Sequence, residues 1–320
     1  MADLTYSLIA ISVLVLAIVI DLLLGDPRWR LHPTFWTGKL IMAIESRLKN
    51  PNPKVEKLNG VLLALAVIGI WTVPVYFGLR FISATPGLLG YVIVAALLLK
   101  LTFSIKLETT CATAAAKDVE TGDLADGRKY VSYFSRRDTT NLNGPEIVSA
   151  IVESIAENLS DFKLSSIIYY AFLGVPGAVA FRTINNLDSV VGFKDKEHIN
   201  IGWFSATLDT LANYIPSRLS ALLIVFAALI LGDNWKAAWK IARRDHVKIS
   251  SINHGWPIAA MAGALNVQLE KPGYYAVGDK IEELSPSHIK RTLRIRYAVI
   301  VLCVILLLPI LLLTNLAFPF

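Results

Sequence analysis

The sequence predicts an all-α fold, a polytopic helical bundle embedded in a membrane. Hydrophobic residues make up 54% of the 320 residues and charged residues only 18%, whereas a soluble domain is nearer half apolar and a quarter charged. The apolar residues are also concentrated in runs of about 20, the length that a helix needs to cross a hydrocarbon core. Both observations indicate several membrane spans.

Four apolar runs form clear spans, each with no more than one charged residue. They are residues 4–24, 61–82, 87–105 and 298–320. The alternative is a set of buried core helices, but a chain of this length has little room to hide four of them. No Lys or Arg precedes the first run and no cleavage motif follows it, so we expect a retained anchor.

The polar stretches between these runs are rich in Lys and Arg, whereas the two ends of the chain have none of these residues. The basic stretches are residues 25–59, 106–163 and 233–296. By the positive-inside rule they face the cytoplasm, and both termini lie outside. We therefore expect a multi-pass protein of the cell membrane.

This orientation requires an even number of crossings between the second and third basic stretches. Two apolar segments are candidates, but residues 164–181 are broken by Gly and Pro, and residues 219–232 are short. They either cross or re-enter and line a polar cavity, where broken helices are tolerated. We favour re-entry because residues 182–218 hold polar side chains suited to a site. With no internal repeat, residues 1–320 are interpreted as a single integral membrane domain.

Charge and cysteine content exclude other classes of protein. The net charge of +6 is explained by basic loops, and no basic helix interleaved with aromatic residues indicates nucleic-acid binding. Cys111 and Cys303 lie far apart, without a Cys or His at metal-ligand spacing nearby. The sequence therefore predicts neither a disulfide framework nor a zinc site.

A helix is expected to begin after Asn143, which is a good N-cap. Pro145 falls in its first turn, and Glu146 completes a capping box. One face of this helix is apolar, and the opposite face carries a row of carboxylates. The row consists of Glu146, Glu153, Glu157 and Asp161.

No Lys or Arg follows four residues after any carboxylate of this row, so nothing within the helix relieves their repulsion. Such a row suits Mg²⁺ or a cationic amine as the missing partner. Arg136 and Arg137, just upstream, have the guanidinium geometry that clamps phosphate or carboxylate oxygens. A solvated acidic face is the alternative interpretation.

Two further clusters, residues 181–188 and 208–218, each place an Asp near amides and an Arg beside an apolar run. An ionisable group at a membrane boundary is unfavourable unless it is functional or paired. The alternative to a site is therefore simple pairing, of Arg182 with Asp188 and of Asp209 with Arg218.

Residues 250–265 contain a turn, Asn253-His-Gly-Trp-Pro, in which Gly255 permits a close backbone approach to a ligand. His254 can serve as a base, but a single His beside a turn is more often structural. Neither a G-x-G-x-x-G motif nor a complete P-loop is present, so any ATP site must be of another type.

Five stretches, taken together and in order, resemble the CobD/CbiB family of cobalamin biosynthesis. They are Asp21-Leu-Leu-Leu-Gly-Asp-Pro27 with His32-Pro33, Arg137-Asp-Thr139, Val152 to Asp161, the Arg182 to Asp188 cluster with Asp209 and Asn213 to Arg218, and Gly255-Trp-Pro with Ala260 to Ala264. The chain departs from the family pattern at Phe162, where Gly is usual, and at Ile252-Asn-His-Gly255. These departures concern substrate detail more than the family.

The resemblance implies an ATP-dependent amide ligase that joins adenosylcobyric acid to aminopropanol or its phosphate, giving adenosylcobinamide or its phosphate. It implies ATP and Mg²⁺ as cofactors, with Mg²⁺ on Glu153, Glu157 and Asp161. Catalytic roles are expected for Glu153, Glu157, Asp188 and Asp209. Phosphate or substrate binding is expected for Arg136, Arg137, Asp138, Asn158, Arg182, Asn185 and Arg218, with Asn253, Gly255 and Trp256 shaping the corrinoid pocket.

Two other functions remain open. A membrane sensor related to the family should lack the acidic row and the Arg-Asp-Thr stretch, both of which this chain has. A transporter is suggested by broken helices and charges within apolar segments, but it should show a repeat between its halves. No such repeat is evident.

Overall fold

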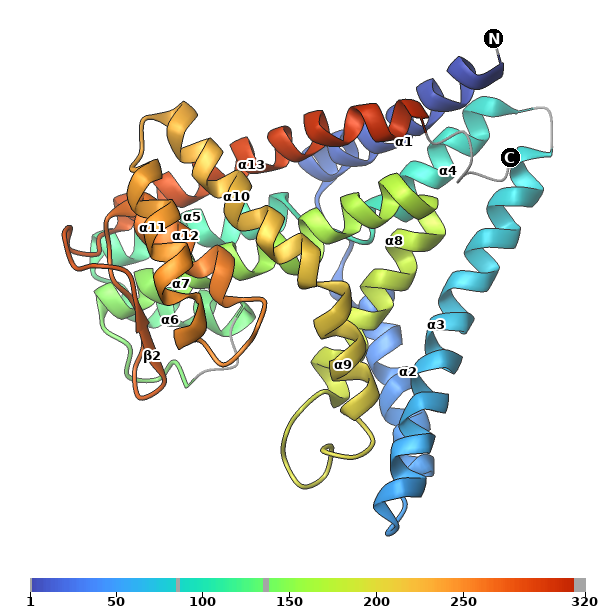
Figure 1. Cartoon of the computed structure of the whole chain (residues 1–320), viewed down its shortest axis with the longest axis horizontal. Helices are drawn as coiled ribbons and strands as arrows, with labels where there is room; N and C mark the ends of the chain where they lie inside the picture. Colours follow the sequence, from blue (N-terminus) through green and yellow to red (C-terminus); the bar gives the residue numbers. More distant parts are fainter. Residues whose placement is uncertain (1, 85–86, 135–137, 314–320) are drawn as a thin grey trace. The chain divides into compact units, whose positions relative to one another are not determined.

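The computed structural model describes residues 2–84, 87–134 and 138–313, and it is almost entirely helical (Figure 1). In chain order the elements are α1 (Ala2–Leu24), η1 (Trp29–Leu31), α2 (Pro33–Leu48), α3 (Pro53–Ser83), α4 (Leu88–Lys100), α5 (Lys106–Thr121), α6 (Leu124–Phe134), α7 (Gly144–Asn158), η2 (Leu159–Leu164), α8 (Ser165–Val191), α9 (Trp203–Ala212), α10 (Tyr214–Leu231), α11 (Trp235–Asp245), η3 (His246–Lys248), α12 (Gly255–Leu265), β1 (Leu269–Lys271), β2 (Tyr275–Val277) and α13 (Pro286–Leu313). The strands form one short antiparallel hairpin. The expected all-α fold is confirmed.

Within the described ranges, five helical stretches are long and apolar enough to cross a membrane. They are Ser7–Leu24, Pro53–Ser83, Gly144–Val191, Tyr214–Leu231 and Pro286–Leu312. These stretches have the length and composition of the spans of a multi-pass membrane protein.

Two apolar segments differ in length from the sequence-based expectation. The run 87–105 forms only the 13-residue helix α4, because the chain turns after Lys100 and the Thr102 hydroxyl bonds the Leu99 carbonyl. Conversely, α10 begins five residues before the apolar run at 219 and reaches 18 residues, with Pro216 accommodated in its first turn. The segment 164–181 does contain a break, at Gly174, whose φ is 67°.

The chain forms two compact units, each built from separate stretches. Unit 1 comprises Met1–Ile105, Ser165–Ala212 and Leu307–Phe320. Unit 2 comprises Lys106–Leu164 and Asn213–Leu306. Candidate spans contribute to both units, and the single membrane domain expected from the sequence stays a prediction.

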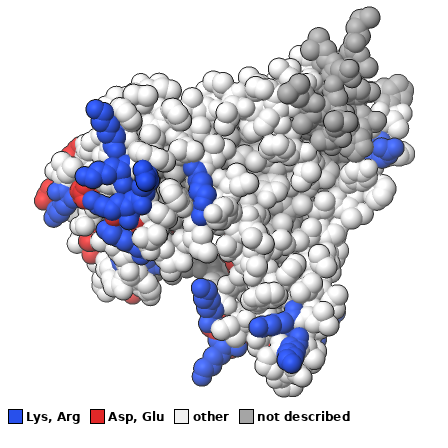
Figure 2. Space-filling model, viewed as in Figure 1, with Lys and Arg blue, Asp and Glu red and all other residues white. Residues whose placement is uncertain are grey.

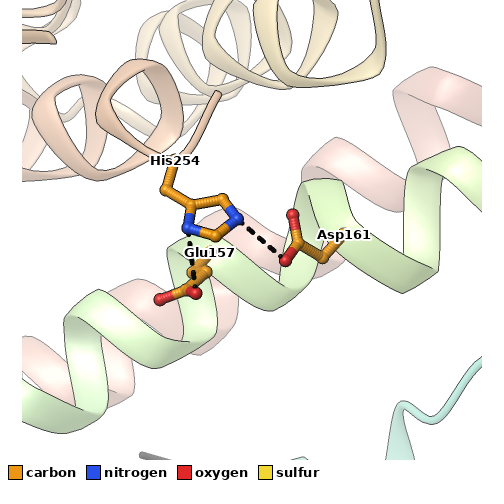
Figure 3. A group of neighbouring side chains, drawn as sticks. All are labelled: Glu157, Asp161 and His254. Atoms are coloured by element: carbon orange, nitrogen blue, oxygen red, sulfur yellow. Dashed lines mark ion pairs between the residues drawn. The ribbon is translucent and has the colours of Figure 1, made fainter. Parts of the chain in front are cut away.

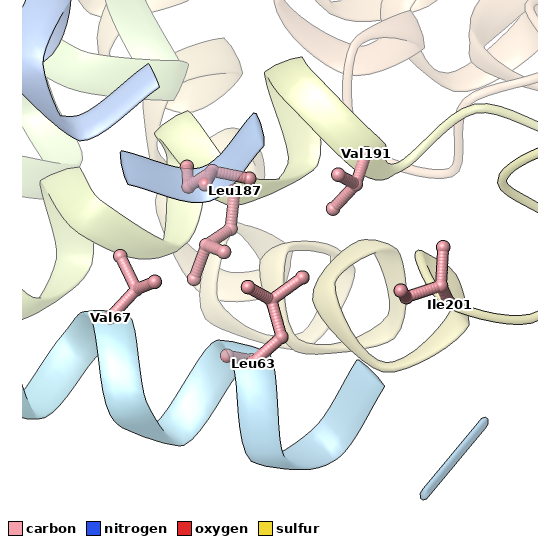
Figure 4. Packing of buried hydrophobic residues seen from close by; sticks show 7 residues of the cluster. Leu63, Val67, Leu187, Val191 and Ile201 are labelled. Atoms are coloured by element: carbon pink, nitrogen blue, oxygen red, sulfur yellow. The ribbon is translucent and has the colours of Figure 1, made fainter. Parts of the chain in front are cut away.

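The core of unit 1 is an aliphatic cluster from α2, α3, α8 and the loop before α9 (Figure 4). Its members are Ile41, Leu63, Ala64, Val67, Leu187, Val191 and Ile201, each fully buried. Gly60 lets α3 meet this loop, because a Cβ there would lie 2.1 Å from the Ile201 carbonyl oxygen.

Unit 1 also holds a buried ion cluster around Lys100. The Lys100 Nζ lies 2.5 Å from Asp26 Oδ1 and 3.6 Å from Asp21 Oδ1, and the Ile105 amide donates to Asp21 Oδ2. His32 stands at its edge, 4.0 Å from Asp26. Burial lowers the pKa of His32. The Asp26 carboxylate opposes this shift, whereas the positive charges of Arg182 and Lys100 add to it.

In unit 2, α11 and α12 pack at close range, since a Cβ on Gly263 would lie 2.5 Å from the Ala237 carbonyl oxygen. The buried Asp245 joins α11 to the end of the hairpin by accepting hydrogen bonds from Arg244 and from the Gly278 amide. Lys248 adds an ion pair at 2.9 Å. Burial alone would raise the pKa of Asp245, but these partners hold it well below its usual range.

Candidate functional site

Three side chains of unit 2 converge from two distant parts of the chain (Figure 3). The two nitrogens of His254 each face a carboxylate, with Nδ1 3.1 Å from Glu157 Oε1 and Nε2 3.1 Å from Asp161 Oδ2. One ligand atom from each of the three residues lies within 4.8 Å of the others. This is a cluster with the residue types and spacing to hold a divalent cation.

The two carboxylates come from one continuous helical segment. Glu157 lies in the last turn of α7, and Asp161 lies in η2, a stretch of π-helix that follows directly. π-helical turns are rare in proteins, and those that occur are often found at functional sites. The carboxylates remain partly accessible, with 38% of the Glu157 side chain and 13% of the Asp161 side chain exposed.

His254 is placed by the backbone that surrounds it. Its backbone amide donates a hydrogen bond to the Ser251 hydroxyl oxygen, and it immediately precedes α12. A Cβ on Gly255 would lie 2.0 Å from the His246 carbonyl oxygen, so glycine allows η3 and the start of α12 to meet. The close approach foreseen at Gly255 is therefore made by the chain's own backbone.

The other two carboxylates of the acidic row are engaged in hydrogen bonds. Glu146 caps its own helix in the predicted capping box. Glu153 is buried and accepts hydrogen bonds from Ser149, one turn earlier, and from the Tyr275 hydroxyl of the hairpin, both at 2.7 Å. Because Tyr275 is distant in sequence, the sequence of the helix alone did not reveal this contact.

Several residues predicted for substrate binding lie next to His254 in the chain or contact its neighbours. Asn253 is buried, and its Oδ1 accepts from Arg218 Nη1 at 3.1 Å. The Arg218 guanidinium lies 3.4 Å from the centre of the Tyr214 ring and 5.6 Å from that of Trp256. Trp256 in turn stacks on His246 at 3.9 Å.

A second group of predicted residues lies together in unit 1. The Arg182 guanidinium donates to Asn185 Oδ1 at 2.7 Å, and Asn185 Nδ2 donates to Asp209 Oδ1 at 3.4 Å. Asp188 lies one turn further along α8 and is half-buried. Arg182 also lines a small apolar cavity of about 100 Å³ between α2, α3, α4 and α8.

The remaining predicted residues occupy different surroundings. Asn158 donates to Glu108 at 3.1 Å. Asp138 is exposed, and hydrogen bonds from the Thr140 hydroxyl and amide lower its pKa. Arg136 and Arg137 lie outside the described residues.

Lys163 of η2 belongs to a buried ion network in unit 2. Glu108 accepts from Lys163 Nζ at 2.9 Å and from Arg296 Nη1 at 2.8 Å. Both cations and the carboxylate are almost fully buried. Breaking such a network leaves a buried charge uncompensated, so it fixes η2 and with it the position of Asp161.

The donor set of the cluster fits a divalent cation. Carboxylate oxygens are the ligands that Mg²⁺ prefers, and an imidazole nitrogen is also accepted by Mn²⁺, Zn²⁺ and similar ions. Glu157 and Asp161 therefore fit the expected Mg²⁺, joined by His254. A role for Glu153 as a ligand stays a prediction.

Sequence reasoning missed His254 as a member of this cluster, and it missed Lys163 and Arg296 as its support. The only available signal for His254 was its position in a Gly-Trp-Pro turn. Its pairing with carboxylates about a hundred residues earlier is a tertiary contact that no local pattern encodes. Lys163, however, directly precedes the apolar segment 164–181, a position at which an ionisable group indicates pairing or function.

Known proteins of one family match most of the chain, including the cluster of Glu157, Asp161 and His254. The family model described as CobD/Cbib protein matches residues 14–296. The "Probable cobalamin biosynthesis protein CobD" of Methanothermobacter thermautotrophicus is 40% identical over 274 residues, covering 86% of this chain and 89% of the relative. The protein of the same name in Thermoplasma acidophilum is also 40% identical, covering 94% and 97%.

A bacterial relative gives a similar result. The "Cobalamin biosynthesis protein CobD" of Geobacter metallireducens is 36% identical over 312 residues, covering 92% of this chain and 95% of the relative. No solved structure matches the chain.

Proposed function

Because the chain belongs to the CobD/CbiB family of cobalamin biosynthesis proteins, we propose that it is an ATP-dependent amide ligase. Its substrates would be adenosylcobyric acid and aminopropanol or aminopropanol phosphate, and its product the corresponding adenosylcobinamide. The observation that carries the proposal is the family match over residues 14–296, a range that contains the Glu157, Asp161 and His254 cluster.

The reaction makes demands that these residues can meet. A propionate carboxylate of the corrinoid attacks the γ-phosphorus of ATP, which gives an acyl phosphate and ADP. The amine nitrogen then attacks the acyl carbon, the C–N bond forms, and the C–O bond to phosphate breaks. The nitrogen must lose a proton for the amide to form, so an acceptor is required beside it.

The carboxylates of the cluster are the proposed acceptors. Glu157 and Asp161 are partly exposed, whereas Glu153 is buried and already accepts two hydrogen bonds. The cationic form of the amine is the alternative to Mg²⁺ as the partner that these carboxylates would attract. His254 would orient both groups through its two ring nitrogens.

Arg218 is the proposed partner of the phosphoryl oxygens. Its guanidinium is held in unit 2 by Asn253 and the Tyr214 carbonyl. Mg²⁺ on Glu157, Asp161 and His254 would supply charge neutralisation to the transferring phosphoryl group. The polar loops would lie on the cytoplasmic side of the cell membrane, with both termini outside.

The proposal is tested with purified protein in detergent. Incubation with adenosylcobyric acid, aminopropanol phosphate, ATP and Mg²⁺ should give the amide, detected by mass spectrometry, together with one ADP per product. Reactions without ATP or with EDTA should give none, and aminopropanol itself is the second amine to try. Folded protein that makes no amide from either amine would contradict the proposal.

A further inference from the structure

Helix α11 presents a basic and aromatic face that the ligase reaction does not use. The residues on its other side, Ala238, Ile241, Ala242 and Asp245, are buried against unit 2. The outward face runs along the whole helix and continues into η3. It consists of Trp235, Lys236, Trp239, Lys240, Arg243, Arg244 and Val247, all exposed.

The aromatic and aliphatic side chains on this face are unusual for a solvated helix. Trp235 and Trp239, one turn apart, are each 39% exposed, and Val247 is 71% exposed. The Lys236 ammonium lies 5.7 Å from the Trp235 ring, and the Arg243 guanidinium lies 5.7 Å from the Trp239 ring. Trp beside Lys and Arg is typical of a helix that lies in the interface between lipid and water.

The charge on this face is of one sign. Its carboxylate neighbours are occupied: Asp245 is buried with Arg244 and Lys248, and Asp233 pairs with Arg291 and Arg294. Among the described residues no carboxylate forms an ion pair with the remaining three cations. These are Lys236, Lys240 and Arg243. Figure 2 shows Lys and Arg gathered over the part of the molecule where α11 lies in Figure 1.

The chain itself brings this face to a membrane boundary. α10, a candidate span, ends at Leu231, where Gly232 turns the backbone with a φ of 78°. α11 begins only four residues after Leu231, at Trp235. A helix that starts so soon after a span begins at the depth of the lipid headgroups.

We propose that the exposed face of α11 binds the surface of the bilayer through anionic phospholipid headgroups. Lys236, Lys240 and Arg243 would contact the phosphates, while Trp235, Trp239 and Val247 would enter the boundary with the acyl chains. Each basic side chain near such a surface strengthens the association about fivefold at moderate ionic strength. A free anion would satisfy the charges but would leave the two indoles in water, so a lipid surface is the better fit.

The test uses full-length protein in nanodiscs of phosphatidylcholine, with or without phosphatidylglycerol. Both native cysteines are buried, so a spin label on Val247→Cys reports selectively on this face. Its collision rates with oxygen and with a water-soluble nickel chelate give its depth. We expect the label to lie in the lipid phase when phosphatidylglycerol is present. The fraction of phosphatidylglycerol that gives half of this change in depth should rise at least threefold in K236Q/K240Q/R243Q.

The matched control is K117Q/K129Q/K280Q, which removes the same charge from exposed positions elsewhere in unit 2. It should bind like the parent protein, and 0.5 M salt should mimic the α11 variant. A label that stays in water at every lipid composition would overturn the proposal. A label at the same depth with and without phosphatidylglycerol would also overturn it. So would an equal loss of lipid binding in the two triple variants.

Discussion

Each unit surrounds one basic side chain with two carboxylates, but the two clusters differ in what the basic group can do. In unit 1, Lys100 lies between Asp21 and Asp26, and only 4% of its side chain is exposed. In unit 2, His254 lies between Glu157 and Asp161 with 27% of its side chain exposed. The carboxylate pair around Lys100 is therefore closed to solvent, whereas the pair around His254 is accessible.

The difference lies in the chemistry of the cation. An ammonium group is a fixed positive charge that occupies the carboxylates, and burying it makes the arrangement structural. An imidazole is neutral or charged near pH 7, and in its neutral form it can share the carboxylates with a metal ion. We infer that the Lys100 cluster stabilises the fold, whereas the His254 cluster takes part in chemistry.

The largest effect is expected from neutralising the accessible carboxylates. Glu157→Gln and Asp161→Asn should each lower the ligase rate by at least about 100-fold, the scale for loss of a positioned proton acceptor. Product formation by mass spectrometry gives the rate, and thermal unfolding should change little. Glu283→Gln, at a side chain that is 91% exposed, is the control. Full activity in a folded Glu157→Gln protein would remove this residue from the mechanism.

The closed cluster should respond in stability. Lys100→Met leaves Asp21 and Asp26 buried without their cation, which should lower the free energy of unfolding by about 3–5 kcal/mol. The measurement is the unfolding midpoint in detergent. Adding Asp26→Asn should restore part of the loss, because one uncompensated charge is removed. A Lys100→Met protein as stable as its parent would contradict the structural role.

A smaller change is expected for His254→Asn, which sharpens the contrast with Lys100. Partly exposed ion pairs contribute about 0–1 kcal/mol, so the unfolding midpoint should hardly move. The ligase rate should fall about tenfold, and bound Mn²⁺, followed by electron paramagnetic resonance, should be weakened. Strong destabilisation with unchanged Mn²⁺ binding would instead give His254 the role that we assign to Lys100.

The smallest effect concerns acid stability at Asp245. Its pKa is lowered in the folded protein, so its ionised form stabilises the fold above the ordinary Asp pKa of about 4, and this contribution is lost as the pH falls. Asp245→Asn should therefore be less stable at pH 7, and the difference should shrink below pH 4 by at most about 1.4 kcal/mol per pH unit. Unfolding midpoints between pH 7 and pH 2 measure it; a constant difference would contradict the assigned pKa direction.

Local signals in the sequence predicted much of the fold. The capping box of Asn143 and Glu146 forms as expected, with Pro145 in the first turn, since all of its contacts lie within four residues. The apolar stripe of the same helix, from Ile147 to Leu159, is buried. The length of α4 was not predictable from hydropathy, because Ile105 is held by Asp21 rather than by the helix.

The candidate site was predicted only in part, for a related reason. Glu157 and Asp161 belong to a helix that its sequence pattern reveals, but Tyr275 and His254 reach that helix from distant segments. The first of these contacts occupies Glu153, and the second completes the cluster. Neither follows from spacing along the chain, and the π-helical turn at Asp161 has no sequence signature that we recognised.

The buried small residues of α12 have a consequence for how mutational data on this chain should be interpreted. Every residue of α12 except Trp256 is buried. A larger residue at Gly255 or Gly263 would place its side chain against the backbone of another segment. In a saturation scan scored by growth, these positions should be as intolerant as Glu157 and Asp161. Scoring protein abundance beside growth separates the two kinds of position, because intolerance at α12 should coincide with lost protein and intolerance at the carboxylates should not.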